Sequence, residues 1–266
     1  GDKSYYSQEL AIYHSMNFNF EKSIAEYLLY LDNNPRQLNY ISNKIMLLSE
    51  YPNTINIIRT TLSNSPLEEA KIILSNLEFK SGNLERCYSI IKTLKNDTYI
   101  ISFIKDLIKI ENFDLAQEVI SYTLETYQHN PKIIDKAVFQ LAQICEIKIQ
   151  NNVNNSLLTS EINYNQLLST NLIEFESTYN DLLNTAMNIY DSLRINSKDN
   201  ISTYHLAEIK YKIQKDFEGA IALYNDVYNN ETKLTYKELS LSRIIDININ
   251  QNNIKNITDI IQKYQQ

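Results

Sequence analysis

The fold is decided by the stretch NFEKSIAEY, which occupies residues 19–27. The same spacing returns as NFDLAQEVI at 112–120 and as DFEGAIALY at 216–224. Each copy has an aromatic residue, a small residue three positions later and a large apolar or aromatic residue one helical turn beyond that. The small residue lets two helices approach closely, and the large residue fills the space beside the contact. The stretch therefore predicts the second helix of a helical hairpin that recurs along the chain.

The composition also favours helices. The 266 residues include only 3 Gly and 4 Pro, too few for the many turns of a β-sandwich or for phosphate-cradling loops. A hydrophobic content of 43% and a charged content of 21% are typical of a folded chain. Because a single helical hairpin cannot bury its apolar face alone, hairpins must stack on one another. We therefore expect an all-α fold.

The segment from Leu10 to Pro35 resembles a tetratricopeptide repeat (TPR). That family has small residues in both helices, where this chain has Ala11 and Ser23, an aromatic residue at Tyr27 and a closing proline. The resemblance extends along most of the chain, strongly in the first, fourth and sixth repeats. It implies a right-handed α-solenoid, a superhelix of about seven TPR-like antiparallel helix pairs, forming one repeat domain over residues 1–266.

Prolines and the returning stretch mark the helix pairs. The first pair runs from about Tyr5 to Pro35, the second ends at Pro66 and the fourth ends at Pro131. The sixth matches the family best between Tyr204 and Val227, and the seventh, Lys237 to Tyr264, keeps the spacing without the small residues. Loss of small residues is typical of a terminal repeat, since no further repeat packs against it.

The fifth pair departs from this period. Residues 132–150 are apolar at helical spacing, but the next five, 151–155, read NNVNN, a composition typical of a loop. A second amphipathic stretch runs from Leu172 to Leu193. We expect an insertion at 151–170, at the tip of a hairpin whose two helices are both longer than in the other pairs.

Few residues suggest chemistry. The three histidines, His14, His129 and His205, have no second His or Cys at metal-ligand spacing. Nucleophile signatures, Gly-rich phosphate loops and calcium-binding loops are absent. Cys87 and Cys145 lie far apart in apolar helical stretches, which favours two buried thiols over a disulfide. We therefore expect no enzyme activity, no metal and no cofactor.

The TPR resemblance implies a concave groove, lined by the first helix of each pair, that holds a peptide or a helix of a partner. Asn39 and Asn43 lie one turn apart, so both amides could reach the backbone of an extended peptide; a solvated face is the alternative. Carried over by repeat position, the groove residues are Gln8, Ile12, Arg36, Asn39, Asn43, Ile72, Asn76, Lys105, Phe139, Gln143, His205, Ile209 and Lys212.

These features predict a non-catalytic scaffold or adaptor that binds a protein or peptide partner in this groove. The alternative is a regulatory TPR protein that senses a peptide or small ligand. The net charge of −7 opposes binding to nucleic acid or anionic lipid, and no apolar run approaches the ~20 residues of a membrane helix. The chain begins at Gly1 without Met, so an N-terminal segment could have been removed, and the cellular compartment stays open.

The seventh pair suggests self-association. It carries more isoleucines than one helix pair can hide, so we expect a homo-oligomer through this repeat or a further helix that covers it. A soluble cap, with polar cover from nearby asparagines, is the alternative. The isoleucines are Ile244, Ile254, Ile257, Ile260 and Ile261, and the asparagines are Asn248, Asn250, Asn252 and Asn253.

Overall fold

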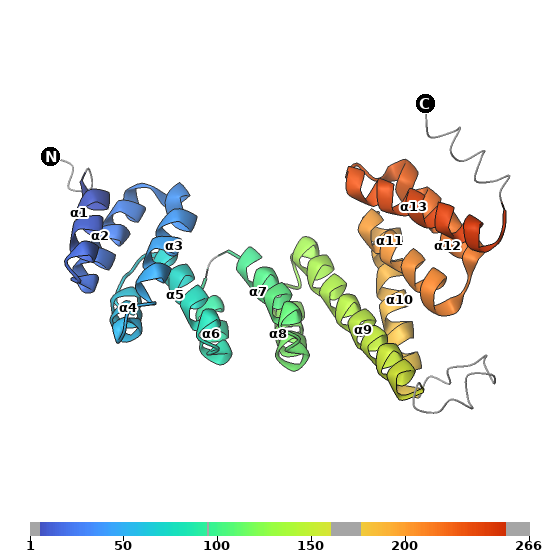
Figure 1. Ribbon diagram of the computed structural model, residues 1–266, viewed down its shortest axis with the longest axis horizontal. Helices are drawn as coiled ribbons and strands as arrows, with labels where there is room; N and C mark the ends of the chain where they lie inside the picture. The colour runs from blue at the N-terminus through green and yellow to red at the C-terminus, as the bar shows by residue number, and fades with distance from the viewer. Residues whose placement is uncertain (1–5, 95, 161–176, 254–266) are drawn as a thin grey trace. The chain divides into compact units, whose positions relative to one another are not determined.

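The computed structural model describes residues 6–94, 96–160 and 177–253, and within these ranges the chain is all-α, without a strand (Figure 1). The expected all-α class is therefore confirmed. The chain divides into two compact units, Gly1–Phe103 and Ile104–Gln266, with α7 (Thr98–Lys109) crossing the division. Most consecutive helices within each unit pack against one another.

The first unit is built from short helices joined by tight connections. Its core includes a cluster in which Ile24, Leu31 and Ile45 are fully buried. A 3-10 turn, Pro35–Gln37, separates the second and third helices, since a proline can begin a helical turn but not continue one. The α-helices are α1 (Ser7–Met16), α2 (Phe20–Asn33), α3 (Leu38–Leu48), α4 (Thr54–Ser63), α5 (Glu68–Lys80) and α6 (Leu84–Ile91).

The small residue of the recurring stretch lies at a close contact between two helices, as its spacing predicts. Ser23 on α2 is fully buried, and its hydroxyl donates a hydrogen bond to the carbonyl oxygen of Ala11 on α1 at 2.8 Å. Such a bond is possible only where the backbone of one helix comes close to a short side chain of the other. Tyr27, one turn later, is buried in the same cluster. The close contact between α1 and α2 is therefore the one expected from the sequence.

The second unit contains the longest helices. It comprises α8 (Phe113–Thr126), α9 (Pro131–Ser160), α10 (Ser177–Ser197), α11 (Asn200–Ile209), a π-helical turn (Lys210–Gln214), α12 (Phe217–Asn230) and α13 (Leu234–Asn250). Ala116 on α8 and Ala220 on α12 are fully buried at the small position. The residue before each aromatic is the helix cap: the side chain of Asn112 accepts from the Leu115 amide, and that of Asp216 from the Gly219 amide.

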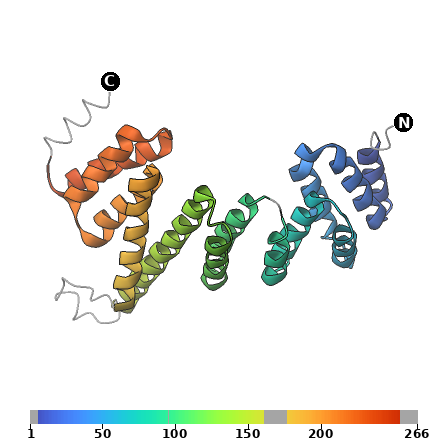
Figure 2. The same cartoon turned by 180° about the vertical axis from the view of Figure 1, so that it is seen from behind.

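The fifth pair confirms one expectation and corrects another. α9 and α10 lie side by side in both views (Figures 1 and 2), and they are longer than any other described helix. The loop expected at 151–155 is wrong, because α9 continues to Ser160. Asparagine is only a moderately poor helix former, and here it extends a helix already nucleated by twenty residues. The rest of the expected insertion, 161–170, lies outside the described residues, as does the start of the stretch from Leu172.

The two cysteines are as expected, since Cys87 and Cys145 are both buried and neither forms a disulfide. At the C-terminal end, Ile244 on α13 is buried in a core cluster with Tyr224 and Ile247, so it offers no exposed surface for association. The other isoleucines of the expected contact, 254–261, lie outside the described residues. Self-association therefore stays a prediction.

Candidate functional site

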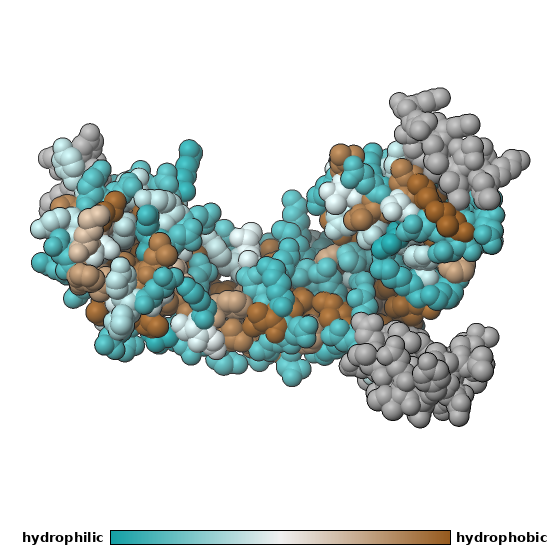
Figure 3. Space-filling view, viewed as in Figure 1, coloured by the Kyte–Doolittle hydropathy of each residue, from teal (hydrophilic) through white to brown (hydrophobic). Residues whose placement is uncertain are grey.

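In the first unit, the expected groove residues lie on α1, the 3-10 turn, α3 and α5. Arg36, Asn39, Asn43 and Asn76 are exposed, and Gln8 and Ile12 are partly exposed. The amide of Gln8 on α1 donates a hydrogen bond to the hydroxyl of Tyr40 on α3 at 3.2 Å. Two first helices thus contact each other, although α2 lies between them in the sequence. Hydrophilic side chains cover much of the face seen in Figure 3.

Ile72 must be withdrawn from the expected groove. It is a buried core residue on α5, a helix whose buried residues also include Ile73, Leu74 and Leu77. Four apolar residues so close together cover more than one side of a helix, so the helix is enclosed by neighbours on several faces. Repeat position therefore does not identify the open face at this helix.

In the second unit, three of the expected residues lie near one another. The rings of Phe139 on α9 and His205 on α11 meet edge to face, with centroids 5.5 Å apart. Gln143 follows one turn after Phe139 and is partly exposed, while Lys105 is exposed. Ile209 is a second correction, because it is fully buried against the cluster formed by α9, α10 and α11.

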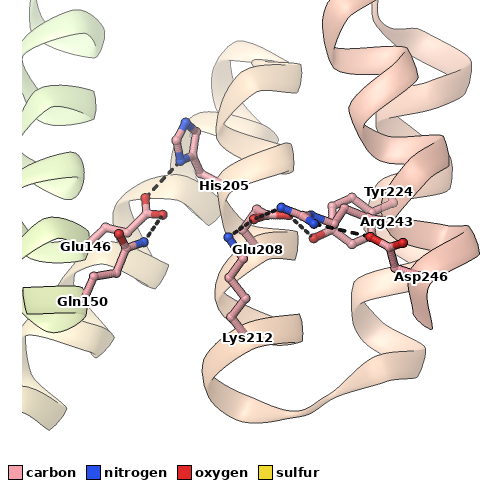
Figure 4. A network of polar contacts seen from close by, with 8 residues as sticks. All are labelled: Glu146, Gln150, His205, Glu208, Lys212, Tyr224, Arg243 and Asp246. Atoms are coloured by element: carbon pink, nitrogen blue, oxygen red, sulfur yellow. Dashed lines mark hydrogen bonds and ion pairs between the residues drawn. The ribbon is translucent and has the colours of Figure 1, made fainter. Parts of the chain in front are cut away.

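His205 is held by two groups that the sequence did not reveal. Its Nδ1 lies 2.9 Å from Oε2 of Glu146 on α9 (Figure 4), and its ring stacks on Tyr190 of α10. The hydroxyl of Tyr190 donates to the same carboxylate oxygen at 3.0 Å. Burial raises the pKa of Tyr190, and the neighbouring Glu146 raises it further. The arrangement fixes the orientation of His205 and ties three helices together.

A second carboxylate, Glu208, lies one turn along α11. It accepts hydrogen bonds from the hydroxyl of Tyr224 at 2.6 Å and from Nε of Arg243 at 2.8 Å, and it pairs with Lys212 (Figure 4). Burial alone would raise the pKa of Glu208, but the bonds from Lys212, Tyr224 and Arg243 outweigh it and lower the pKa. Lys212, an expected groove residue in the π-helical turn, is thus engaged by a carboxylate four residues before it.

The first unit holds a comparable carboxylate, Glu78 on α5. Arg59 of α4 donates to it twice, at 2.9 and 3.0 Å, and Asn83 donates at 2.8 Å. Arg86 of α6 pairs with it at 3.3 Å. Burial would raise the pKa of Glu78, but the bonds from Arg59 and Asn83 lower it. A buried carboxylate with this many donors is already occupied, so it serves as a link between helices.

The described residues contain no group of three or more His, Cys, Asp or Glu side chains placed to hold a metal ion. Glu78 and Glu208 escaped the sequence reasoning because acidic residues on an amphipathic helix usually face solvent. The signal available was weak: each lies on a helix beside buried apolar positions, and the arginines that donate to them, Arg59 and Arg243, are 19 and 35 residues away.

Comparison of the sequence with models of known protein families and with characterised proteins gave no match. Across the part of the chain that the structure describes, no helix is both long and apolar enough to cross a membrane. The function must therefore be argued from the geometry alone.

Proposed function

We propose that this chain is a non-catalytic scaffold, a right-handed superhelix of TPR-like helix pairs that binds a protein or peptide partner along the first helices of successive pairs. The repeated packing supports it. Ser23, Ala116 and Ala220 are all fully buried at the small position, although they lie in three different pairs. A chain built from one repeating contact presents an extended surface more readily than a closed pocket.

The observation that carries the proposal is the hydrogen bond between Gln8 and Tyr40. It brings a side chain of α1 against one of α3, and on this proposal these are the first helices of two successive pairs. Asn39 and Asn43 are exposed on α3, next to Tyr40 and one turn apart. Each amide can both donate to and accept from a peptide backbone, so this face suits an extended segment of a partner.

The test compares two sets of asparagine variants by crosslinked co-purification from the native host. The double variant Asn39→Ala/Asn43→Ala removes both amides, and alanine favours a helix more than asparagine does, so the fold should persist. Asn56→Ala, exposed on the second helix α4, is the matched control. We expect a partner retained by the wild type and the control to be lost about tenfold in the double variant.

Equal recovery of every partner by all three proteins would contradict binding at this face. Circular dichroism and a thermal melt of each variant separate loss of binding from loss of fold. If a partner is recovered equally by the wild type, the double variant and the control, and is also captured by the second unit alone, that result would place the binding surface in the second unit.

A further inference from the structure

The second unit contains a cavity of about 530 Å³, bounded by residues of α7, α9, α10, α11 and the start of α13. We call it the lysine pocket, because five of its lining residues are Lys105, Lys132, Lys136, Lys198 and Lys233. Its volume lies within the range of small-molecule sites in proteins. Two of the lining residues, Lys105 and Phe139, belong to the groove set expected from the sequence.

The charges around this pocket are unbalanced. The lining includes two carboxylates, Asp135 and Asp199, against five lysines. Asp135 accepts a hydrogen bond from the hydroxyl of Ser197 at 2.7 Å, and Asp199 accepts one from the Ser202 amide at 3.0 Å as the cap of α11. Among the described residues, none of the five lysines forms an ion pair within 4.0 Å. This positive excess stands out in a chain whose net charge is −7.

The lining also includes a polar side chain, Gln140, that can donate to a ligand. Gln140 on α9 lines the pocket with only 3% of its surface exposed. We find no hydrogen bond from its side chain to any other described residue. The amide is not among the described side-chain atoms that are both fully buried and without a partner, so its atoms keep some exposed surface. The amide of Gln140 is available to donate to an oxygen in the pocket.

The rest of the pocket suits an organic body. Phe139, Leu193 and Ile201 contribute an apolar part of the lining. Lys132 lies in the first turn of α9, and Lys233 is the N-cap of α13, so the positive ends of these two helix dipoles reinforce the lysines. An inorganic anion would contact only the lysines and Gln140. A ligand that joins an anionic group to an apolar ring would contact the apolar residues as well.

We propose that the lysine pocket binds a small organic phosphate, in which an apolar ring contacts Phe139, Leu193 and Ile201 while the phosphate meets the lysines and the Gln140 amide. Phosphate is favoured over a single carboxylate because five ammonium groups can neutralise a dianion. Bound there, the ligand bridges α9, α10 and α11, and it stabilises the second unit against unfolding. This binding is independent of the partner surface on α1 and α3.

The probe is 1-naphthyl phosphate, with inorganic phosphate and 1-naphthol as its two halves and 1-naphthoate as the carboxylate counterpart. Isothermal titration should show binding of the probe at least about tenfold tighter than of any of these three. Lys132→Gln/Lys136→Gln should weaken the probe about tenfold and lower its thermal stabilisation. Lys22→Gln/Lys80→Gln makes the same charge change on exposed lysines of the first unit and should leave binding unaltered.

Gln140→Leu keeps the volume and removes the amide, so it should weaken 1-naphthyl phosphate but not 1-naphthol. This difference separates a lost contact from a lost fold. The proposal is overturned if the wild type binds no probe at about 1 mM, or if both lysine pairs change binding equally. It is also overturned if an acidic peptide binds at these lysines while the naphthyl phosphate does not, since the pocket would then belong to a peptide surface.

Discussion

Each unit has a buried carboxylate that links helices, Glu78 in the first and Glu208 in the second, and the two are held in different ways. Glu78 of the first unit is bound by arginines from the helix before it and the helix after it, Arg59 of α4 and Arg86 of α6. Glu208 of the second unit has its cationic partners and its closest phenol after it in the chain, at Lys212, Arg243 and Tyr224. In both units the result is the same: one negative charge links three consecutive helices.

The two carboxylates differ in how deeply they are buried and in how many of their partners are cations. The side chain of Glu78 has no exposed surface, and that of Glu208 keeps 7%. Glu208 also receives a neutral phenol donor, whereas the charged partners of Glu78 are both guanidinium groups. A more deeply buried charge loses more when a cation is removed, so the first unit should be the more sensitive.

The largest effect is expected from Arg59→Met in the first unit. Methionine keeps the length of the side chain but leaves Glu78 without its two shortest arginine bonds, so we expect a loss of about 3 kcal/mol in the free energy of unfolding. Urea denaturation measures it. Arg86→Met is the control: Arg86 is 51% exposed and contacts Glu78 at 3.3 Å, so its loss should cost under about 1 kcal/mol.

A smaller effect is expected from Arg243→Met in the second unit. Glu208 retains Lys212 and Tyr224, so the loss should be about 2 kcal/mol by the same measurement. Asp246→Asn, which touches Arg243 only at 3.4 Å through Nη1, should change little. If Arg243→Met costs more than Arg59→Met, the comparison between the two units is reversed.

The next prediction uses two tyrosines at the same repeat position. Tyr224 on α12 and Tyr27 on α2 each follow the small residue by one turn, and both are buried. Only Tyr224 donates to a buried carboxylate, at 2.6 Å. Tyr224→Phe should therefore cost about 1 kcal/mol, and Tyr27→Phe should cost clearly less. Equal losses in the two variants would show that packing of the ring, and not the hydroxyl bond, sets the effect.

The helices could be predicted from the sequence because the repeat leaves little choice. A small residue flanked by two large ones at helical spacing, as at Ser23 and Ala220, packs well only as a helix against a helix. The end of α9 could not be predicted from the asparagines at 151–155, since local preference yields to continuation of a long helix. Ile72 and Ile209 were assigned by repeat position, which does not report how many neighbours enclose a helix.

The candidate sites could be predicted only in fragments. Phe139 and Lys105 were named for a groove, and both line the lysine pocket, but the other four lysines lie on segments that come together only in the folded chain. Glu78 and Glu208 carried only a weak sequence signal, because the arginines Arg59 and Arg243 that donate to them are 19 and 35 residues away. Interactions between helices far apart in sequence are set by packing, which a repeat pattern alone does not specify.

The smallest effect concerns acid. The pKa values of Glu78 and Glu208 are lowered in the folded chain from an ordinary value near 4.5, so both carboxylates bind protons more readily when the chain is unfolded. Their contribution is therefore complete above that value, and it is lost as the pH falls through the folded pKa. Urea denaturation between pH 7 and pH 3 should show a declining free energy of unfolding, and Glu78→Gln and Glu208→Gln should each make the decline shallower.

Some decline should persist in both variants, because the pKa values of Asp216 and Glu231 are also lowered. A variant whose stability falls as steeply as that of the wild type would show that its carboxylate titrates alike in the folded and unfolded chain, and its unit would then lack the charged link on which the comparison rests.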